Sequence, residues 1–250
     1  GILLKTAAYG LMRFCLPLFP EASAEFAPIA MGLGLIGIVY GALLAFAQTD
    51  IKRLIAYTSI SHMGFVMIAI YSGSYIALQG AVVQMVAHGL SAAGLFILCG
   101  QLHERLHTRD LRQMGGLWSR MRYLPAIMLF FAVASLGMPG TGNFVGEFLI
   151  LVGSFPAAPW VTVTATFGLV LASVYALIML QRACFGAAKA ETSLGGLDGR
   201  ELAMMLLLMA LLLLFGFYPQ PLIDTASHSL HQLLYWFALP APMPTAGVLQ

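Results

Sequence analysis

Four titratable side chains lie inside long apolar stretches of the sequence. They are Lys5, His62, His88 and Glu147. A charged side chain in the middle of a membrane costs roughly 2.5 to 3.5 kcal/mol, so each of these residues calls for a partner, a water-filled cavity or a function. Lysine, histidine and glutamate can all bind and release a proton, and burial brings their pKa values toward a common range. Together they predict a relay in which a proton passes between them over water.

Polar neighbours extend these positions along the same helix faces. Gln84, His88 and Ser91 are spaced i, i+4 and i+7, while Thr58 and Ser59 precede His62 by four and three residues. We expect these stripes to hold water. Static alternatives stay open: a neutral imidazole can simply bridge two helices, and Lys5 and Glu147 can form a buried ion pair.

The stretch "MPGTGNFVGEF", Met138 to Phe148, predicts a broken helix inside an apolar run. The residues that interrupt it are Pro139, Gly140 and Gly142. Freed backbone groups at membrane depth are tolerated only where protein or water satisfies them, and a new half-helix directs its positive end toward an anion such as Glu147. Thr141 or Asn143 is expected to cap the new start. The alternative is a proline kink that only shapes packing.

The sequence "HERLH", His103 to His107, matches the H-E-x-x-H pattern, in which two histidines bind zinc and Glu104 acts as base. It would imply an intramembrane zinc metalloprotease, a remote alternative. Arg105 stands inside the motif, the motif ends a helix in an Arg-rich loop, and no obvious third ligand follows. We therefore expect a solvated helix end and no metal site.

Other cofactor chemistry has little support. His62 and His88 fall on consecutive antiparallel stretches and could ligate a haem, which would make the chain an electron carrier. A phosphate-binding glycine loop, a dinucleotide fingerprint and an iron–sulfur cysteine pattern are all absent from the sequence, and its three cysteines lack paired spacing. A purely structural membrane scaffold is a further alternative.

The composition predicts a membrane protein, because 60% of the 250 residues are hydrophobic and 9% are charged, against about 25% charged in soluble domains. Residues 1–218 hold about seven apolar stretches long enough to span a bilayer, and 219–250 form a tail that could include an interfacial helix. We expect an all-α, polytopic transmembrane helix bundle with one broken helix. The spans are 1–19, 27–47, 54–71, 76–101, 123–155, 160–180 and 202–218.

Basic residues predict the orientation. Ten of the twelve Lys and Arg residues fall in alternate connections, after the second, fourth and sixth spans, and the opposite connections and the tail carry none. The positive-inside rule places the basic loops in the cytoplasm and the C-terminal tail in the periplasm, with the fifth stretch crossing once. Arg13, inside the first span, can snorkel to the non-cytoplasmic surface.

Arg13 and Pro17 also argue against a signal peptide, and the start at Gly1 suggests the back part of a longer chain.

Three stretches resemble a known family: "AFAQTDIKRLIAYTSISHMGFV", "QMVAHGLSAAGLFILCGQL" and "LGMPGTGNFVGEF". They are similar to the antiporter-like membrane subunits of respiratory complex I, the proton-translocating NADH:quinone oxidoreductase, and most similar to its bacterial M subunits. The resemblance covers essentially the whole chain. It implies spans eight to fourteen of a fourteen-span fold, holding the second of two inverted repeats, in the bacterial inner membrane.

The resemblance also implies residue roles and partners. Lys5 would be the central-axis lysine of span eight, His62 and His88 polar-axis groups of spans ten and eleven, and Glu147 the terminal carboxylate of the broken span twelve. A glutamate there is similar to M subunits, whereas L and N subunits carry lysine. Other membrane subunits, especially neighbouring antiporter-like ones, and the lipid bilayer would be the partners, with no nucleic acid. Flavin, iron–sulfur clusters and quinone would bind to partner subunits and no cofactor to this chain. The main alternative is a subunit of a multisubunit Na+(K+)/H+ antiporter or a membrane-bound hydrogenase.

Overall fold

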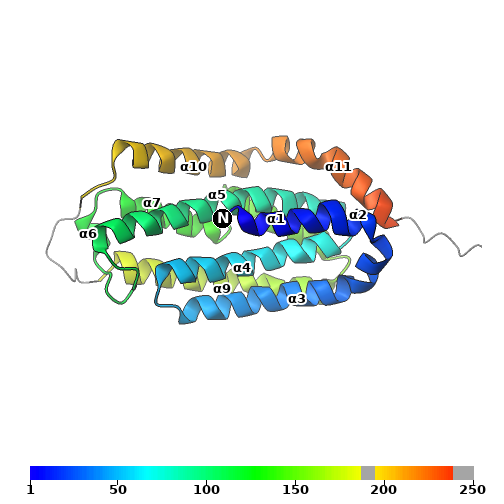
Figure 1. Ribbon diagram of the computed structural model, residues 1–250, viewed down its shortest axis with the longest axis horizontal. Coiled ribbons are helices and arrows are strands. Elements are labelled where there is room, and N and C mark those ends of the chain that lie inside the picture. The colour runs from blue at the N-terminus through cyan, green and yellow to red at the C-terminus, as the bar shows by residue number, and fades with distance from the viewer. Residues whose placement is uncertain (187–194, 239–250) are drawn as a thin grey trace, which may run out of the picture.

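The structure, a computed structural model, describes residues 1–186 and 195–238. Within these ranges the backbone is helical apart from turns, connections and a single antiparallel bridge between Asp50 and Asp110. The long helices lie side by side along the longest axis of the molecule (Figure 1). The predicted all-α membrane bundle is therefore confirmed.

Five of the helices are long and apolar enough to cross a membrane. They are α3 (Pro20–Ala47), α4 (Ile51–Tyr71), α5 (Tyr75–Leu106), α9 (Pro159–Cys184) and α10 (Gly199–Phe217). Helix α5 packs against α4, α10, α11 (Gln220–Ala238) and the shorter helices α7 (Leu124–Ser135) and α8 (Gly142–Ser154). The remaining long helices, α3 and α9, pack against α4 and against each other.

The predicted first span is helical but not regular. It consists of α1 (Leu3–Gly10), a π-helical turn at Leu11–Cys15 that contains Arg13, and α2 (Leu16–Leu18). Only Phe19 separates it from α3, which begins at Pro20, earlier than the predicted start of the second span at 27. Proline at the first helical turn and Glu21 near the positive helix end both favour this early start.

Helices α7 and α8 form the broken helix predicted around Pro139. Each successive position on this pair meets an earlier position on α5, so the pair passes α5 once and in one direction, as the single crossing requires. The neighbouring positions are Phe131 with Gly94, Gly142 with Ala87, Gly146 with Gln84, and Gly153 with Ala77.

Helices α10 and α11 form a second interrupted pair along α5. Figure 1 shows α11 following α10 along one edge of the bundle. Near the C-terminal end of α5, Arg105 donates a 2.7 Å hydrogen bond to Glu201 of α10. Near the N-terminal end of α5, the ring of Tyr75 stacks on His231 of α11 with centroids 4.2 Å apart. The placement of α11 at the membrane interface stays a prediction.

The connections that carry basic residues meet at one end of the bundle (Figure 1). Backbone hydrogen bonds join them: Ile51 N–H to the Arg109 carbonyl at 3.0 Å, and Gly116 N–H to the Phe185 carbonyl at 3.1 Å. Asp50 caps α4 by accepting from the Lys52 and Arg53 amides. The basic connections thus lie together at one end of the bundle, as the alternating charge pattern predicted. The location of this end in the cytoplasm stays a prediction.

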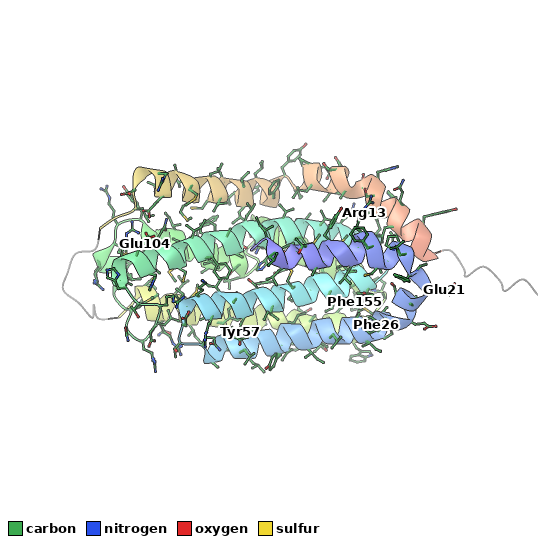
Figure 2. The ribbon with its side chains drawn as sticks, viewed as in Figure 1. Arg13, Glu21, Phe26, Tyr57, Glu104 and Phe155 are labelled. Atoms are coloured by element: carbon green, nitrogen blue, oxygen red, sulfur yellow. The ribbon has the colours of Figure 1, made fainter. Side chains whose placement is uncertain are left out.

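Buried polar side chains divide the core into two apolar clusters. One cluster, which includes Leu102 and Phe131, extends toward the end with the basic connections, and the other, which includes Phe65 and Ile150, lies toward the opposite end. Figure 2 shows the side chains that fill the bundle between the helices. The predicted site residues other than Lys5 lie within or beside this division, so the packing of the two clusters fixes their positions.

Candidate functional site

Glu147 and His62 form the centre of the buried polar side chains that lie between the two apolar clusters. We call this group of side chains the polar layer. Glu147 of α8 is 2% exposed and His62 of α4 is 1% exposed. His62 Nδ1 lies 2.8 Å from Glu147 Oε1, and Gln84 Nε2 donates to the same oxygen at 2.8 Å. With an ionised carboxylate, the proton of the His62 bond lies on Nδ1. The predicted members His62, Gln84 and Glu147 are therefore in direct contact.

The second ring nitrogen of His62 faces a residue that we did not predict. The hydroxyl of Tyr175 lies 3.3 Å from His62 Nε2, and Tyr175 is 1% exposed. Gln84, Glu147, His62 and Tyr175 thus form one hydrogen-bonded chain across α5, α8, α4 and α9. A signal was available in the sequence, because tyrosines of membrane helices favour the interfaces and this one lies deep in an apolar stretch.

His88 lies beside this chain without being hydrogen-bonded to it. Its ring is tilted by 41° against that of His62, with centroids 4.9 Å apart. Both His88 ring nitrogens are buried without a partner among the described residues, as are Gln84 Oε1 and Asn143 Oδ1. Asn143 Nδ2 donates to Ser91 Oγ at 3.0 Å, and Ser91 Oγ lies 3.3 Å from the His88 carbonyl. The layer thus contains more buried polar atoms than its protein hydrogen bonds satisfy.

Lys5 approaches the cluster without joining it. Its side chain is partly buried, and its ammonium donates to the Gly1 carbonyl one turn away. Gly1 packs against Gly89 and Ala93 of α5, next to His88. The partner of Glu147 is His62, so the static Lys5–Glu147 ion pair left open by the sequence does not form.

Two of the polar residues that were predicted to hold water beside His62 are hydrogen-bonded to their own helix. The hydroxyls of Thr58 and Ser59 are buried, and both donate to the Ile55 carbonyl, at 2.8 and 3.1 Å. Such back-bonding is a common alternative for hydroxyl side chains in helices. The structure therefore places Thr58 and Ser59 near His62 without linking them to the chain.

The helix break is where Pro139, Gly140 and Gly142 predicted it, between Ser135 and Gly142. The capping prediction is correct for the position of Thr141 and wrong for Asn143. Thr141 occupies the N-cap position of α8, but its hydroxyl donates to the Met138 carbonyl at 2.7 Å instead of accepting from the helix. Asn143 lies inside α8 and uses its amide to reach Ser91 of α5.

Two glycines that the sequence did not single out shape the carboxylate site. Gly137 lies in the break with φ +75°, and a Cβ there would lie 2.6 Å from Glu147 Oε2. Gly146 faces α5, where a Cβ would lie 2.7 Å from the Gln84 backbone nitrogen. One glycine therefore gives space to the carboxylate, and the other lets α8 approach α5 closely enough for the Gln84–Glu147 bond.

The competing motifs do not assemble in this fold. Helix α5 ends at Leu106 and His107 takes a left-handed conformation with φ 53°, so the two histidines of the motif do not lie on one continuous helix. The described residues contain no group of three or more histidine, cysteine, aspartate or glutamate residues placed to hold a metal ion. Both ring nitrogens of His62 are engaged and its ring packs against His88, which leaves no space between them for a haem.

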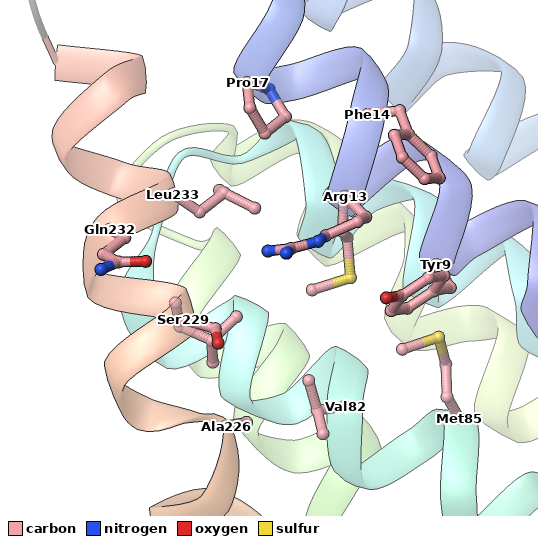
Figure 3. A pocket seen from close by; sticks show the side chains of 12 residues that line it. Tyr9, Arg13, Phe14, Pro17, Val82, Met85, Ala226, Ser229, Gln232 and Leu233 are labelled. Carbon is pink, nitrogen blue, oxygen red and sulfur yellow. The ribbon is translucent and has the colours of Figure 1, made fainter.

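A hollow at the side of the bundle lies away from the polar cluster. It has a volume of about 770 Å³ and is bounded by the first helix, α5 and α11. Figure 3 shows the Arg13 side chain extending into it. Lys5, His62, His88 and Glu147 do not line it. The candidate site is thus a packed hydrogen-bonded interior and not a ligand pocket.

A membrane-protein family described as "NADH:quinone oxidoreductase/Mrp antiporter, TM" matches residues 1–173. The chain belongs to this family. The matched range holds Lys5, His62, His88 and Glu147 and extends into α9. The predicted resemblance to antiporter-like subunits is confirmed, and with it a multi-pass membrane protein.

Relatives within the family agree with the resemblance to M subunits. The chain is 72% identical over 236 residues to the NADH-quinone oxidoreductase subunit M of Pseudomonas aeruginosa, a match that covers 94% of the chain and 46% of the relative. It therefore spans about half the length of the curated relatives it matches. In the structure of respiratory complex I from Thermus thermophilus with bound NADH, one chain matches with a TM-score of 0.89 and 31% identity, over 94% of this chain and 50% of that one.

A more distant match shows the fold alone. One chain of the Mrp complex from Dietzia sp. DQ12-45-1b matches with a TM-score of 0.80 and 17% identity, over 93% of this chain and 52% of that one. The bundle is therefore an antiporter-like fold shared by different membrane complexes.

Proposed function

We propose that this chain is part of a proton-translocating subunit of an NADH:quinone oxidoreductase in a bacterial inner membrane. Lys5, His62, His88 and Glu147 would form its relay. The observation that carries the proposal is the 2.8 Å contact between His62 and Glu147 in the sealed interior of the bundle. Buried ionisable pairs contribute little net stability compared with apolar packing, so this pair is better explained by function.

The geometry suits proton transfer. A proton on His62 Nδ1 already lies along the line to Glu147 Oε1, so exchange between these two groups needs no large movement. His88 is the next site, because its ring touches that of His62 and both its nitrogens are free to accept or donate. Buried polar atoms left unsatisfied by protein groups are commonly bonded to ordered water, which would bridge His88 to Asn143, Gln84 and Lys5.

The driving force would come from outside the chain. Quinone reduction in partner subunits would change the electrostatics or conformation of adjacent membrane subunits, and Lys5 would respond first because its ammonium has no carboxylate partner among the described residues. A charge moving toward or away from His88 changes the free energy of a proton on each imidazole. Flavin, iron–sulfur clusters and quinone would bind to those partners.

The test uses the full-length subunit in the purified complex, reconstituted in proteoliposomes. Glu147→Gln and Lys5→Ala should each lower the rate of proton pumping by roughly tenfold or more, because each removes a proton-transfer group. Glu104→Gln, which alters a glutamate at the end of α5, is the matched control and should pump normally. An unchanged proton-to-electron ratio in an assembled Glu147→Gln complex would remove Glu147 from the relay.

A subunit of a multisubunit cation/proton antiporter is the second candidate, favoured by the fold shared with the Mrp complex. Purification of the full-length subunit with its partners separates the two functions. NADH-oxidising partners support the oxidoreductase, whereas sodium-dependent proton transport without such partners supports the antiporter.

A further inference from the structure

We propose that Tyr175 is a positioning residue that holds His62 in both of its charge states, an inference that rests on the proposed proton relay. The hydroxyl of Tyr175 lies 3.3 Å from His62 Nε2, while His62 Nδ1 bonds to Glu147. Tyr175 therefore fixes the ring from the side opposite to the carboxylate. This position requires a group that can form a hydrogen bond with Nε2 whether or not Nε2 carries a proton.

A tyrosine hydroxyl has that property because it both donates and accepts. When His62 is neutral with its proton on Nδ1, Nε2 is an acceptor and the Tyr175 O–H donates to it. When His62 is protonated, both ring N–H groups donate, Nδ1–H to Glu147 and Nε2–H to the Tyr175 oxygen. Transfer of the Nδ1 proton to Glu147 Oε1 then leaves a neutral ring that keeps its proton on Nε2 and still donates to Tyr175. Rotation of the hydroxyl hydrogen about the C–O bond thus lets one oxygen serve every protonation state of the ring, and the imidazole does not move from Glu147.

The surroundings of Tyr175 indicate holding and not conduction. Its ring packs edge-on against Phe46 of α3, with centroids 6.1 Å apart, and its neighbours along α9 include the buried apolar residues Ala172, Ala176 and Met179. Among the described residues, the hydroxyl of Tyr175 is hydrogen-bonded to His62. The hydrogen-bonded chain that starts at Gln84 thus ends at Tyr175, and the proton would pass toward His88 or Glu147.

Tyr175→Phe in the full-length subunit of the assembled complex tests this role. The variant keeps the ring that packs on Phe46 and removes one oxygen. We expect the pumping rate to fall by roughly tenfold, because a buried hydrogen bond to an ionisable ring is lost. Tyr57→Phe is the matched control, because it removes the same atom from the half-buried tyrosine of α4, and it should pump as the unmodified protein does.

A spectroscopic readout separates a hydrogen-bonding role from a packing role. With isotope-labelled tyrosine, the infrared C–O stretching band reports whether a hydroxyl donates or accepts. We expect a tyrosine band that shifts when NADH starts turnover, that disappears in Tyr175→Phe and that persists in Tyr57→Phe. If Tyr175→Phe does not assemble, a ring-fluorinated tyrosine at position 175 keeps the hydroxyl but changes its acidity, and it should alter the pumping rate where the same replacement at 57 does not.

The outcomes distinguish this inference from the proposed function. Normal pumping and an unchanged tyrosine band in Tyr175→Phe, or an unaltered rate with the fluorinated residue, overturn the role of Tyr175. If Glu147→Gln abolishes pumping in the same preparation, the relay survives and only Tyr175 is removed from it. If Glu147→Gln also pumps normally, the relay itself fails.

Discussion

At the scale of single residues, the two oxygens of Glu147 have different surroundings. Oε1 accepts from His62 and Gln84, both at 2.8 Å. Oε2 faces the backbone of Gly137, where the helix is interrupted. Oε1 is therefore held by two hydrogen bonds, whereas Oε2 faces the space at the helix break. The break therefore provides space as well as polarity for the group most directly bonded to His62.

Gly137→Ala tests the need for that space. Alanine would have to adopt φ +75° and would bring a Cβ to 2.6 Å from Glu147 Oε2. The left-handed conformation alone costs roughly 1 to 2 kcal/mol, so we expect a lower melting temperature of the full-length subunit and slower pumping. Gly89→Ala is the control, because a Cβ at Gly89 has no heavy atom within 4 Å. Equal stability and activity of the two variants would contradict this explanation.

At the scale of elements, the contact between α5 and α8 sets the length of the Gln84–Glu147 bond. Small residues allow the two backbones to approach each other: Gly80 lies beside Gly146 and Ile150, and Gly153 lies beside Ala77. Close helix contact through small residues is typical of membrane bundles, where apolar burial alone does not drive association. The spacing of these glycines thus contributes to the site without any of them being chemically active.

Gly146→Leu is expected to separate α8 from α5, because the new Cβ would lie 2.7 Å from the Gln84 backbone nitrogen, which cannot move as a side chain can. Overpacking of this kind costs roughly 1 to 3 kcal/mol. Thermal aggregation of the full-length subunit should therefore begin at a lower temperature, and pumping should fall. Gly37→Leu in α3, where a Cβ has no neighbour within 4 Å, should change neither. A similar aggregation temperature for both variants would argue against close contact as the determinant.

At the scale of the whole molecule, the site is held by elements anchored at their ends. The basic connections are tied to one another by backbone hydrogen bonds at one end of the bundle. Arg105 bonds to Glu201 and to the carbonyls of Gly195 and Gly196, which fastens the start of α10 to the end of α5. Between the two apolar clusters, the polar layer is thus enclosed by helices whose mutual positions are fixed.

The sequence predicted the members of the site better than their contacts. His62, His88 and Glu147 stand out because ionisable residues are costly in apolar stretches, and Pro139 and Gly140 mark the break by backbone chemistry alone. Spacing shows which residues share a helix face but not which helices face each other. Contacts between α4, α8 and α9 cannot be read from the spacing of residues in one sequence. The pairing of Glu147 with His62 and the contribution of Tyr175 depend on these contacts, and the bond of Thr58 to its own helix was not predicted either.

The central claim, that Glu147 gains and loses a proton as the complex works, is tested most directly by infrared difference spectroscopy of the full-length complex during NADH oxidation. A carboxylic acid C=O band that changes in the unmodified complex and is absent from the Glu147→Gln complex is the predicted result. An identical carboxyl difference spectrum in both complexes would contradict the claim, because Glu147 would then keep one protonation state throughout turnover.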